Sequence, residues 1–200
     1  MDWEEYEKTF YLEPDGILEQ ENNYFKHIIL NLNMYNKKCL DIGCGSGYWI
    51  KLFLDRRSIV TGIDIDIKAI KQCQSQYPDC DFIFIEEELP SFAGSSFDFI
   101  IANWIFQEIY NHKTFKKYIK EIKRILKPGG NLVIANNIYP DNRVLYESTR
   151  LGDIFGNNGN PPFLRFFSNN SLSKIFRSTN FKRNGHKVVG YSFFEIFEKI

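Results

Sequence analysis

Three alternating glycines stand in residues 40–47, which read Leu-Asp-Ile-Gly-Cys-Gly-Ser-Gly. The run follows a short apolar segment and precedes an amphipathic one, a pattern that predicts a strand, a tight turn and the start of a helix. Glycine is required where the backbone takes a positive φ or where a ligand approaches it closely. A ligand resting on such a turn also meets the N-terminal amides of the next helix. The chemistry predicted here is therefore the binding of a nucleotide-like molecule.

The spacing of these glycines decides which ligand of this kind fits. A dinucleotide fingerprint reads G-x-G-x-x-G. Counted from Gly43, its third glycine would fall at Tyr48, and counted from Gly45 it would fall at Ile50. The run is instead an acid, Asp41, followed by x-G-x-G-x-G. That pattern resembles motif I of the class I S-adenosylmethionine (SAM)-dependent methyltransferases, although the glycines alone leave a nicotinamide-binding fold open.

Acidic residues follow the next two predicted strands. Asp64 stands 23 residues after Asp41, where a carboxylate can accept hydrogen bonds from both hydroxyls of a ribose. The resemblance implies the same role for it with SAM. After the third strand, Glu86 or Glu87 matches the family's acid that contacts the adenine amino group, and the Leu-Pro pair at 89–90 matches as well. The family's usual residue there is Asp, so this contact departs from its pattern.

Two further segments extend the resemblance in the same order along the chain. Residues 96–103 resemble the family's fourth strand, and residues 122–134, with Pro-Gly-Gly at 128–130, resemble its entrance into the fifth strand. The specific motifs cover residues 38–135, and residues 164–200 match more loosely. The chain is thereby identified as resembling class I SAM-dependent methyltransferases of the small-molecule type. The implied fold is α/β, a three-layer Rossmann-like sandwich with a mostly parallel seven-stranded sheet and an antiparallel C-terminal hairpin.

Apolar periodicity along the chain predicts alternating strands and helices. The last two strands have no helix between them, so they must be antiparallel. We predict helices over 17–35, 47–56, 67–76, 113–126 and 171–178, and strands over 38–42, 58–63, 82–85, 97–102, 132–135, 181–189 and 191–197.

The length of 200 residues suits one domain. We expect an N-terminal helical cap over 1–36, a SAM-binding core over 38–135, a variable substrate loop over 139–170, and a C-terminal helix with antiparallel strands over 171–200. The 139–170 stretch is the longest one without a predicted element, and such insertions often cover a site.

The resemblance also implies roles for individual residues. The backbone of the glycine turn passes under the methionine part of SAM, Asp41 takes its amino group, and Ile65 packs on the adenine. The cofactor set is Asp41, Gly43, Cys44, Gly45, Gly47, Asp64, Ile65, Glu86, Glu87, Asn103 and Trp104. From the residues alone, core packing stays open for Ile65, and helix capping or a turn stays open for Asp41 and Asp64.

Methyl transfer from SAM is an in-line displacement, with S-adenosylhomocysteine as the product. It requires alignment and exclusion of water, but neither a metal nor a covalent intermediate. A base is required only where the acceptor is protonated, and the candidates are His112, Tyr139 and Glu108.

Aromatic residues make up 16% of the chain and concentrate in its variable parts, which predicts a small, partly apolar or ring-shaped acceptor. Packing of a small domain by large side chains explains them equally well. The candidate acceptor contacts are Tyr11, Trp104, Gln107, Tyr139 and Phe163.

Charge and composition narrow the remaining classes. The formal net charge is zero, which disfavours a nucleic-acid binder. The lysine-rich helix predicted within 113–127 is by default a solvated face, but it keeps an RNA or protein acceptor open. A SAM-binding module without catalysis is the third alternative. The four cysteines form no C-x-x-C pair, and no secretory or membrane-spanning pattern is found, so we expect a cytoplasmic protein with reduced thiols. The oligomeric state stays open.

Overall fold

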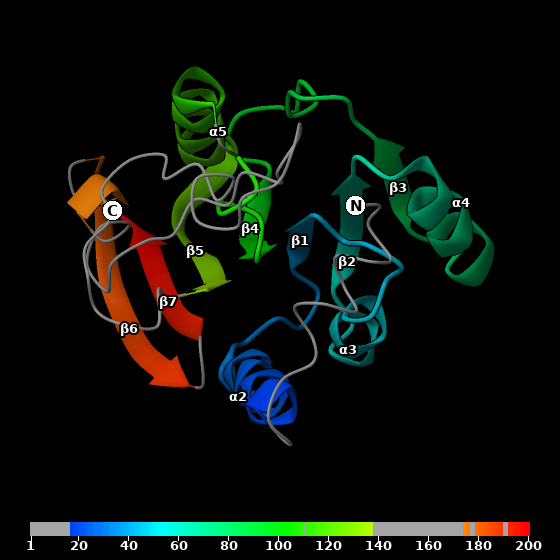
Figure 1. The fold of residues 1–200 in the computed structure, drawn as a ribbon, viewed down its shortest axis with the longest axis horizontal. Helices are drawn as coiled ribbons and strands as arrows, with labels where there is room; N and C mark the ends of the chain where they lie inside the picture. The colour runs from blue at the N-terminus through cyan, green and yellow to red at the C-terminus, as the bar shows by residue number, and fades with distance from the viewer. Residues whose placement is uncertain (1–16, 110, 138–173, 177–178, 190–191) are drawn as a thin grey trace, which may run out of the picture.

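The computed structural model describes residues 17–109, 111–137, 174–176, 179–189 and 192–200 (Figure 1). Its centre is a seven-stranded sheet of order β3-β2-β1-β4-β5-β7-β6. The strands are β1 (Lys38–Ile42), β2 (Ile59–Asp64), β3 (Asp81–Phe84), β4 (Phe97–Asn103), β5 (Leu126–Asn137), β6 (Phe181–Val189) and β7 (Ser192–Lys199). The helices are α2 (Ile17–Asn31), α3 (Ile50–Asp55), α4 (Ile67–Gln76) and α5 (His112–Ile125).

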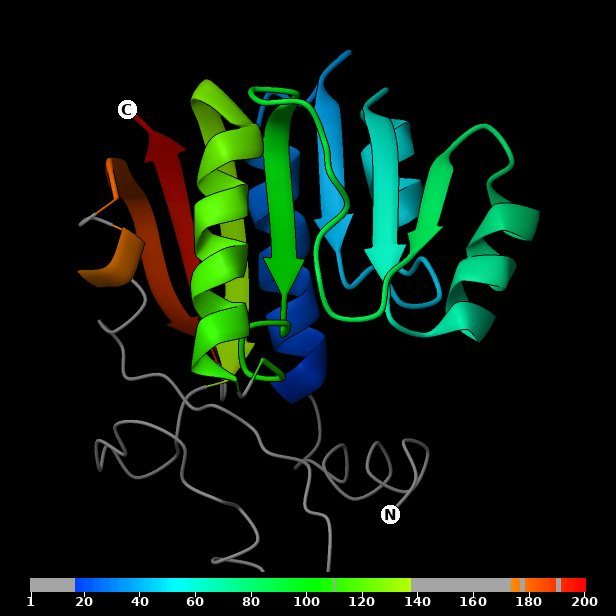
Figure 2. The same ribbon diagram turned by 90° about the horizontal axis from the view of Figure 1, so that it is seen from above.

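The strand directions confirm the predicted sheet. Strands β1 to β5 pair in parallel, whereas β7 is antiparallel to both β5 and β6. The arrowheads of β1 to β5 in Figure 2 therefore point to one edge of the sheet. In open parallel sheets ligands bind at this carboxyl edge, because the connections to the helices leave room there.

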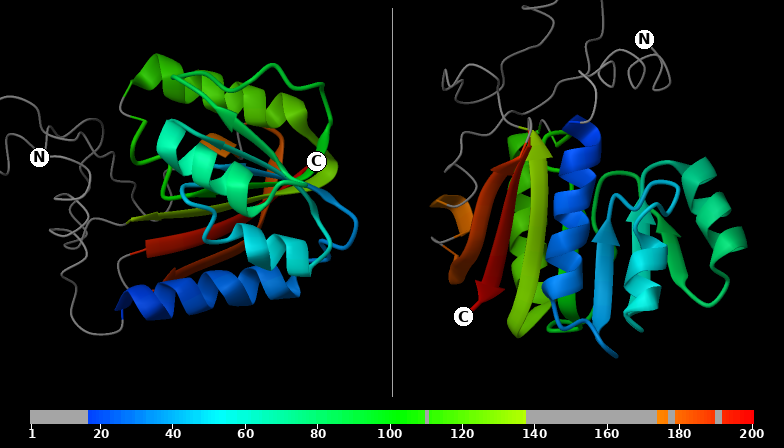
Figure 3. Two further views of the ribbon diagram at one scale, coloured as in Figure 1. Left: turned by 90° about the vertical axis from the view of Figure 1, so that its right-hand side faces the viewer. Right: turned by 90° about the horizontal axis from the view of Figure 1, so that it is seen from below.

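Side chains of the central strands alternate between two apolar layers, as the period of a strand requires. On one face, Ile100 and Ile134 pack with Ile122 of α5. On the other face, Ile101 and Val133 pack with residues from α2, α3 and α4. Figures 2 and 3 show the two sides, with α5 across one face and α2 across the other. Both faces of the parallel strands are therefore covered, which explains why these strands read as continuous apolar runs.

Helix α5 is fixed at its N-terminus by a side-chain cap. Asn111 has an extended backbone, and its Oδ1 accepts hydrogen bonds from the amides of Lys113 and Thr114. These amides would otherwise lack partners in the first turn. Phe115 and Ile119 then begin the buried stripe of the helix.

Several predicted boundaries were wrong. Helix α2 ends at Asn31 and not at 35, and Asn31 Nδ2 donates to the carbonyl of His27 at 2.8 Å. Helix α3 begins at residue 50 and not at 47, because the turn still closes through a hydrogen bond from Gly47 N to Cys44 O. Of the helix predicted over 171–178, residues 174–176 are helical and the rest lies outside the described residues.

Strand β5 is longer than the predicted 132–135. It starts at Leu126 and runs through the Pro-Gly-Gly sequence that we expected to separate helix from strand. Gly129 has a φ of +74°, and a Cβ on Gly130 would lie 2.9 Å from the carbonyl oxygen of Asp98. The glycines thus allow the chain to enter the sheet early, beside the register shift between Phe97 and Phe99 of β4.

No described helix is long and apolar enough to cross a membrane. Among the same residues, no group of three His, Cys, Asp or Glu side chains is arranged to hold a metal ion.

We expect Asn111→Ala to lower the free energy of unfolding by about 1 kcal/mol, because the first turn of α5 loses its cap. Urea unfolding of the variant measures this loss. Asn111→Asp is the matched control, since it keeps a capping oxygen, and an equal loss in both variants would contradict the capping role.

Candidate functional site

The glycine turn lies at the carboxyl ends of β1 and β2. Gly43, Gly45 and Gly47 have φ of +75°, +50° and +84°, the left-handed region that other residues enter at a cost. The amides of Gly43 and Cys44 both donate to the carbonyl of Ile63, at 2.8 and 3.1 Å. These bonds hold the turn against β2, so its path is fixed by neighbouring backbone.

The three glycines differ in what surrounds them. A Cβ on Gly43 would overlap the side chain of Ile105 at 1.9 Å, and one on Gly47 would lie 3.0 Å from Cys73 Sγ. A Cβ on Gly45 would meet nothing within 4 Å. The side of Gly45 on which a side chain would stand is therefore open, which leaves room for a ligand against the middle of the turn.

Asp64, the last residue of β2, ties this turn to the next helix. Its Oδ2 accepts a hydrogen bond from the amide of Gly45 at 2.7 Å, and its Oδ1 accepts one from the amide of Asp66 at 2.9 Å. The turn-stabilising role left open by the sequence is therefore present. Each carboxylate oxygen can accept a further hydrogen bond, so the same side chain still offers acceptors to a ligand's hydroxyl groups.

Asp41 is a buried acid beneath the turn, with 2% of its surface exposed. Burial, and then the negative charge of Asp64, raise its pKa to about 7. Both causes disfavour the charged carboxylate. A cation placed at this edge would relieve them, which makes Asp41 suited to face a ligand's ammonium group.

The residues that follow β2 and β3 lie at the surface. Ile65 is 67% exposed, so the alternative that it packs in the core is wrong. It offers an exposed apolar side chain next to Asp64, as a platform for a ring would. Glu86 and Glu87 are both exposed, and the amide of Ile85 just before them donates to the carbonyl of Asp64 at 2.9 Å.

Buried amide side chains mark the carboxyl ends of β4 and β5. Asn103 is 8% exposed and Asn136 is fully buried, yet among the described residues neither side chain finds a hydrogen-bond partner for its nitrogen or its oxygen. Buried polar groups normally find partners, so each such exception requires an explanation. We expected Asn103 at the site but not Asn136. The Asn pair at 136–137, directly after the apolar run of strand five, was the signal for it.

Trp104 follows Asn103 with a φ of +53°, which is strained for a bulky residue. Its amide donates to Ala135 O at 2.6 Å, and its ring nitrogen donates to Ser192 Oγ at 3.0 Å. Its ring meets that of Phe194 edge-on, with centroids 6.4 Å apart. These contacts hold the strained backbone at the carboxyl edge of the sheet.

The β4–α5 connection carries two further candidates. Gln107 is buried, and burial raises the pKa of Glu108 to about 7 despite a hydrogen bond from Gln107. His112 begins α5, but its side chain is outside the described part of the structure, as are Tyr11, Tyr139 and Phe163 entirely. Of the three candidate bases, Glu108 is thus the one whose environment is defined.

The architecture and the glycine turn define a Rossmann-like methyltransferase fold. Residues 40–134 match the family model described as a methyltransferase domain. A SAM-dependent methyltransferase from Methanosarcina mazei has a similar structure, with a TM-score of 0.71 and 22% identity, covering 86% of this chain and 97% of that one. The chain thus carries a match to a methyltransferase domain over residues 40–134 and shares the fold of a SAM-dependent methyltransferase.

Two curated relatives are more similar in sequence. The phthiotriol/phenolphthiotriol dimycocerosates methyltransferase of Mycobacterium leprae is 30% identical over 159 residues, 74% of this chain and 57% of that protein. The demethylmenaquinone methyltransferase of Renibacterium salmoninarum is 30% identical over 104 residues, 52% of this chain and 43% of that protein. The chain therefore spans about half the length of the curated relatives it matches.

We expect Asp41→Asn to stabilise the ligand-free protein at pH 8 by on the order of 2 kcal/mol, because a buried charge is removed. The pKa of Asp41 is raised in the folded state. The loss of folding stability caused by its buried charge is therefore absent near pH 4, grows with pH, and is complete above about pH 7. The stability difference between variant and wild type should follow the same course in urea unfolding at several pH values. A difference independent of pH would contradict the raised pKa.

Proposed function

We propose that this protein transfers a methyl group from SAM to a small, partly apolar or aromatic molecule by direct in-line displacement. The observation that carries the proposal is the left-handed glycine turn, held by Asp64 and open at Gly45. Both curated relatives are named for methyl transfer to small molecules rather than to a macromolecule, which supports a small-molecule acceptor.

The chain's own residues fit the cofactor part by part. Asp41 would face the ammonium group, and the glycine turn with Cys44 would lie under the methionine chain. Asp64 would accept hydrogen bonds from the ribose, with Ile65 against the adenine and Glu86 or Glu87 at its edge. Asn103 and Trp104 would lie beside the methionine end, where the unpartnered amide of Asn103 is available. SAM itself supplies a methyl group activated by its sulfonium.

An aromatic wall lies on the α2 side of the sheet, at the end of β4 and the start of β7, where it would stand beside the methionine end of the cofactor. Tyr24 of α2 and Trp104 both contact Phe194 edge-on, with ring centroids 5.1 and 6.4 Å away. Aromatic rings of this kind hold apolar or ring-shaped ligands and exclude water from the reacting atoms. We propose Gln107 as a polar contact for the acceptor and Glu108 as the base that takes its proton.

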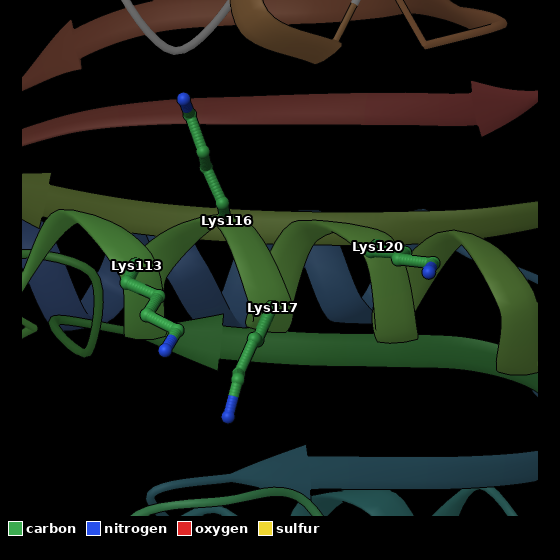
Figure 4. Close-up of a pocket in the computed structure, with 4 residues that line it drawn as sticks. All are labelled: Lys113, Lys116, Lys117 and Lys120. Atoms are coloured by element: carbon green, nitrogen blue, oxygen red, sulfur yellow. The ribbon is translucent and has the colours of Figure 1, made fainter.

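A second candidate is an RNA acceptor, favoured by the basic outer face of α5. Lys113, Lys116, Lys117 and Lys120 line a shallow hollow there (Figure 4). The side chains do not converge on one point, since Lys116 extends away from Lys113 and Lys117. Lys117 is also paired with Glu88. Lysines that point apart suit a solvated face better than a phosphate site, so we rank this candidate below the first.

The cofactor part of the proposal is tested by calorimetry of SAM, S-adenosylhomocysteine and NAD binding. We expect the two adenosyl ligands to bind and NAD not to bind. Asp64→Ala should weaken SAM binding by about tenfold or more, since charge-assisted hydrogen bonds are lost. Asp66→Asn is the control, because it keeps the cap of α4 and should leave the affinity unchanged. Equal affinities in all three proteins would refute the ribose contact.

Transfer itself is tested with SAM carrying a radiolabelled methyl group and a panel of phenols, naphthols and heteroaromatic amines. Label in a small molecule supports the first candidate, and salt-sensitive label in RNA supports the second. Cofactor binding without any transfer would favour the non-catalytic module.

From the raised pKa of Glu108 we predict how the transfer rate depends on pH. A base works in its deprotonated form, and the pKa of Glu108 is raised to about 7, so the rate should rise through pH 7 and level off above it. Glu108→Gln should lower kcat by about 100-fold or more and abolish this rise. Steady-state rates between pH 5.5 and 9 measure both effects. If Glu108→Gln kept the wild-type dependence of the rate on pH, another group would be the base.

A further inference from the structure

Asn136 lies one residue before the end of β5. It is fully buried, and within the described part of the chain neither its Nδ2 nor its Oδ1 has a hydrogen-bond partner. An amide taken out of water without partners destabilises the folded state. A leucine of similar size at this position would avoid that cost. The buried amide therefore requires a partner beyond the described residues.

The alternation of β5 shows which side of the sheet Asn136 occupies. Ile134 and Leu132, two and four residues earlier, belong to the apolar layer packed against α5. Val133 and Ala135 belong to the opposite layer. Asn136 therefore lies on the α5 side, opposite Phe193 of β7 in the register.

Asn103 lies on the other side of the sheet. It continues the positions of Phe99 and Ile101 on β4, whose side chains pack with α2 and α3. The two unpartnered amides thus stand on neighbouring strands but on opposite faces. One ligand group at Asn103 does not account for Asn136, so a second polar group is required on the α5 side.

The β4–α5 connection is on that same side, because Phe106 packs in the α5 layer with Ile134 and Phe193. The connection also carries Gln107 and Glu108, the proposed acceptor contact and base. Asn136 is therefore placed with the acceptor half of the site rather than with the cofactor half.

The charged groups farther along this face already have partners. Glu195, opposite Ile134 in the register, accepts from Arg183 Nη1 at 3.2 Å and lies 3.4 Å from His186 Nδ1. The charges of Arg183 and Glu195 compensate each other. What Asn136 adds is a neutral donor and acceptor, opposite Phe193 in the register and two residues after Ile134 on the same face. A neutral amide suits a neutral ligand group, because a buried ionised group is costly.

We propose that Asn136 binds the methyl acceptor, and that its amide hydrogen-bonds a neutral hydroxyl or carbonyl group carried by a ring. This inference rests on the proposed function, and it adds a polar group at a defined place on the acceptor.

The test uses 2-naphthol and naphthalene as probes, two rings that differ in one hydroxyl group. Their binding to the protein saturated with S-adenosylhomocysteine is measured by ligand-observed NMR. We expect the wild type to bind 2-naphthol about tenfold more tightly than naphthalene, as one buried hydrogen bond allows. Asn136→Leu should bind the two probes equally. It should keep the affinity for S-adenosylhomocysteine and melt at the same or a higher temperature.

Asn131→Leu is the matched control, since Asn131 lies at the opposite end of β5 and is only half-buried. It should keep the preference for 2-naphthol. The inference is overturned if Asn136→Leu also keeps that preference, if the wild type shows none, or if Asn136→Leu melts several degrees lower, because the amide would then be structural. A wild type that fails to bind S-adenosylhomocysteine would instead remove the proposed function on which the inference rests.

Discussion

The carboxylate of Asp64 accepts the amide of Gly45 at one oxygen and the amide of Asp66 at the other. These two bonds join the glycine turn after β1 to the start of α4. The backbone amides of Gly43 and Cys44 add a second attachment, to the carbonyl of Ile63. A turn with three left-handed residues has many conformations available in isolation. Fixed at these points, it keeps one path and leaves its middle open, so a ligand meets a surface that is already ordered.

Polar groups that cost stability gather at the same edge of the sheet. Asp41 is buried beside another acid, and Asn103 and Asn136 are buried with no hydrogen-bond partner in the part of the chain that the structure describes. Elsewhere the two apolar layers are filled with aliphatic and aromatic side chains. Natural proteins depart from good packing and full hydrogen bonding mainly where function requires it. The concentration of these exceptions at the carboxyl ends of β1, β4 and β5 is therefore an argument for a ligand site that does not depend on the glycine motif.

The amphipathic helix α5 illustrates how one element meets two requirements. Its inner stripe, including Phe115, Ile119 and Ile122, closes one face of the sheet. Its outer lysines remain in solvent, and Lys117 reaches Glu88 on the loop after β3. An exposed pair of this kind contributes little to stability. The lysine-rich character of the segment thus follows from the need for a solvated face, which is why charge alone was a weak guide to the acceptor.

The sequence by itself determined the order of the candidate site residues along the chain, namely the glycine turn, Asp64 and the acids after β3. It also determined the parallel core and the antiparallel C-terminal pair of strands. These follow from local requirements, because a positive φ selects glycine and a buried parallel strand selects a continuous apolar run. The end of α2 and the start of α3 depended instead on particular local hydrogen bonds, and the start of β5 on a close approach to Asp98, which is distant in sequence. The exposure of Ile65, the raised pKa of Glu108 and the unpartnered amide of Asn136 were likewise decided only by the tertiary structure. Burial and partnership are properties of what surrounds a side chain, and those surroundings are assembled from strands that the sequence lists far apart.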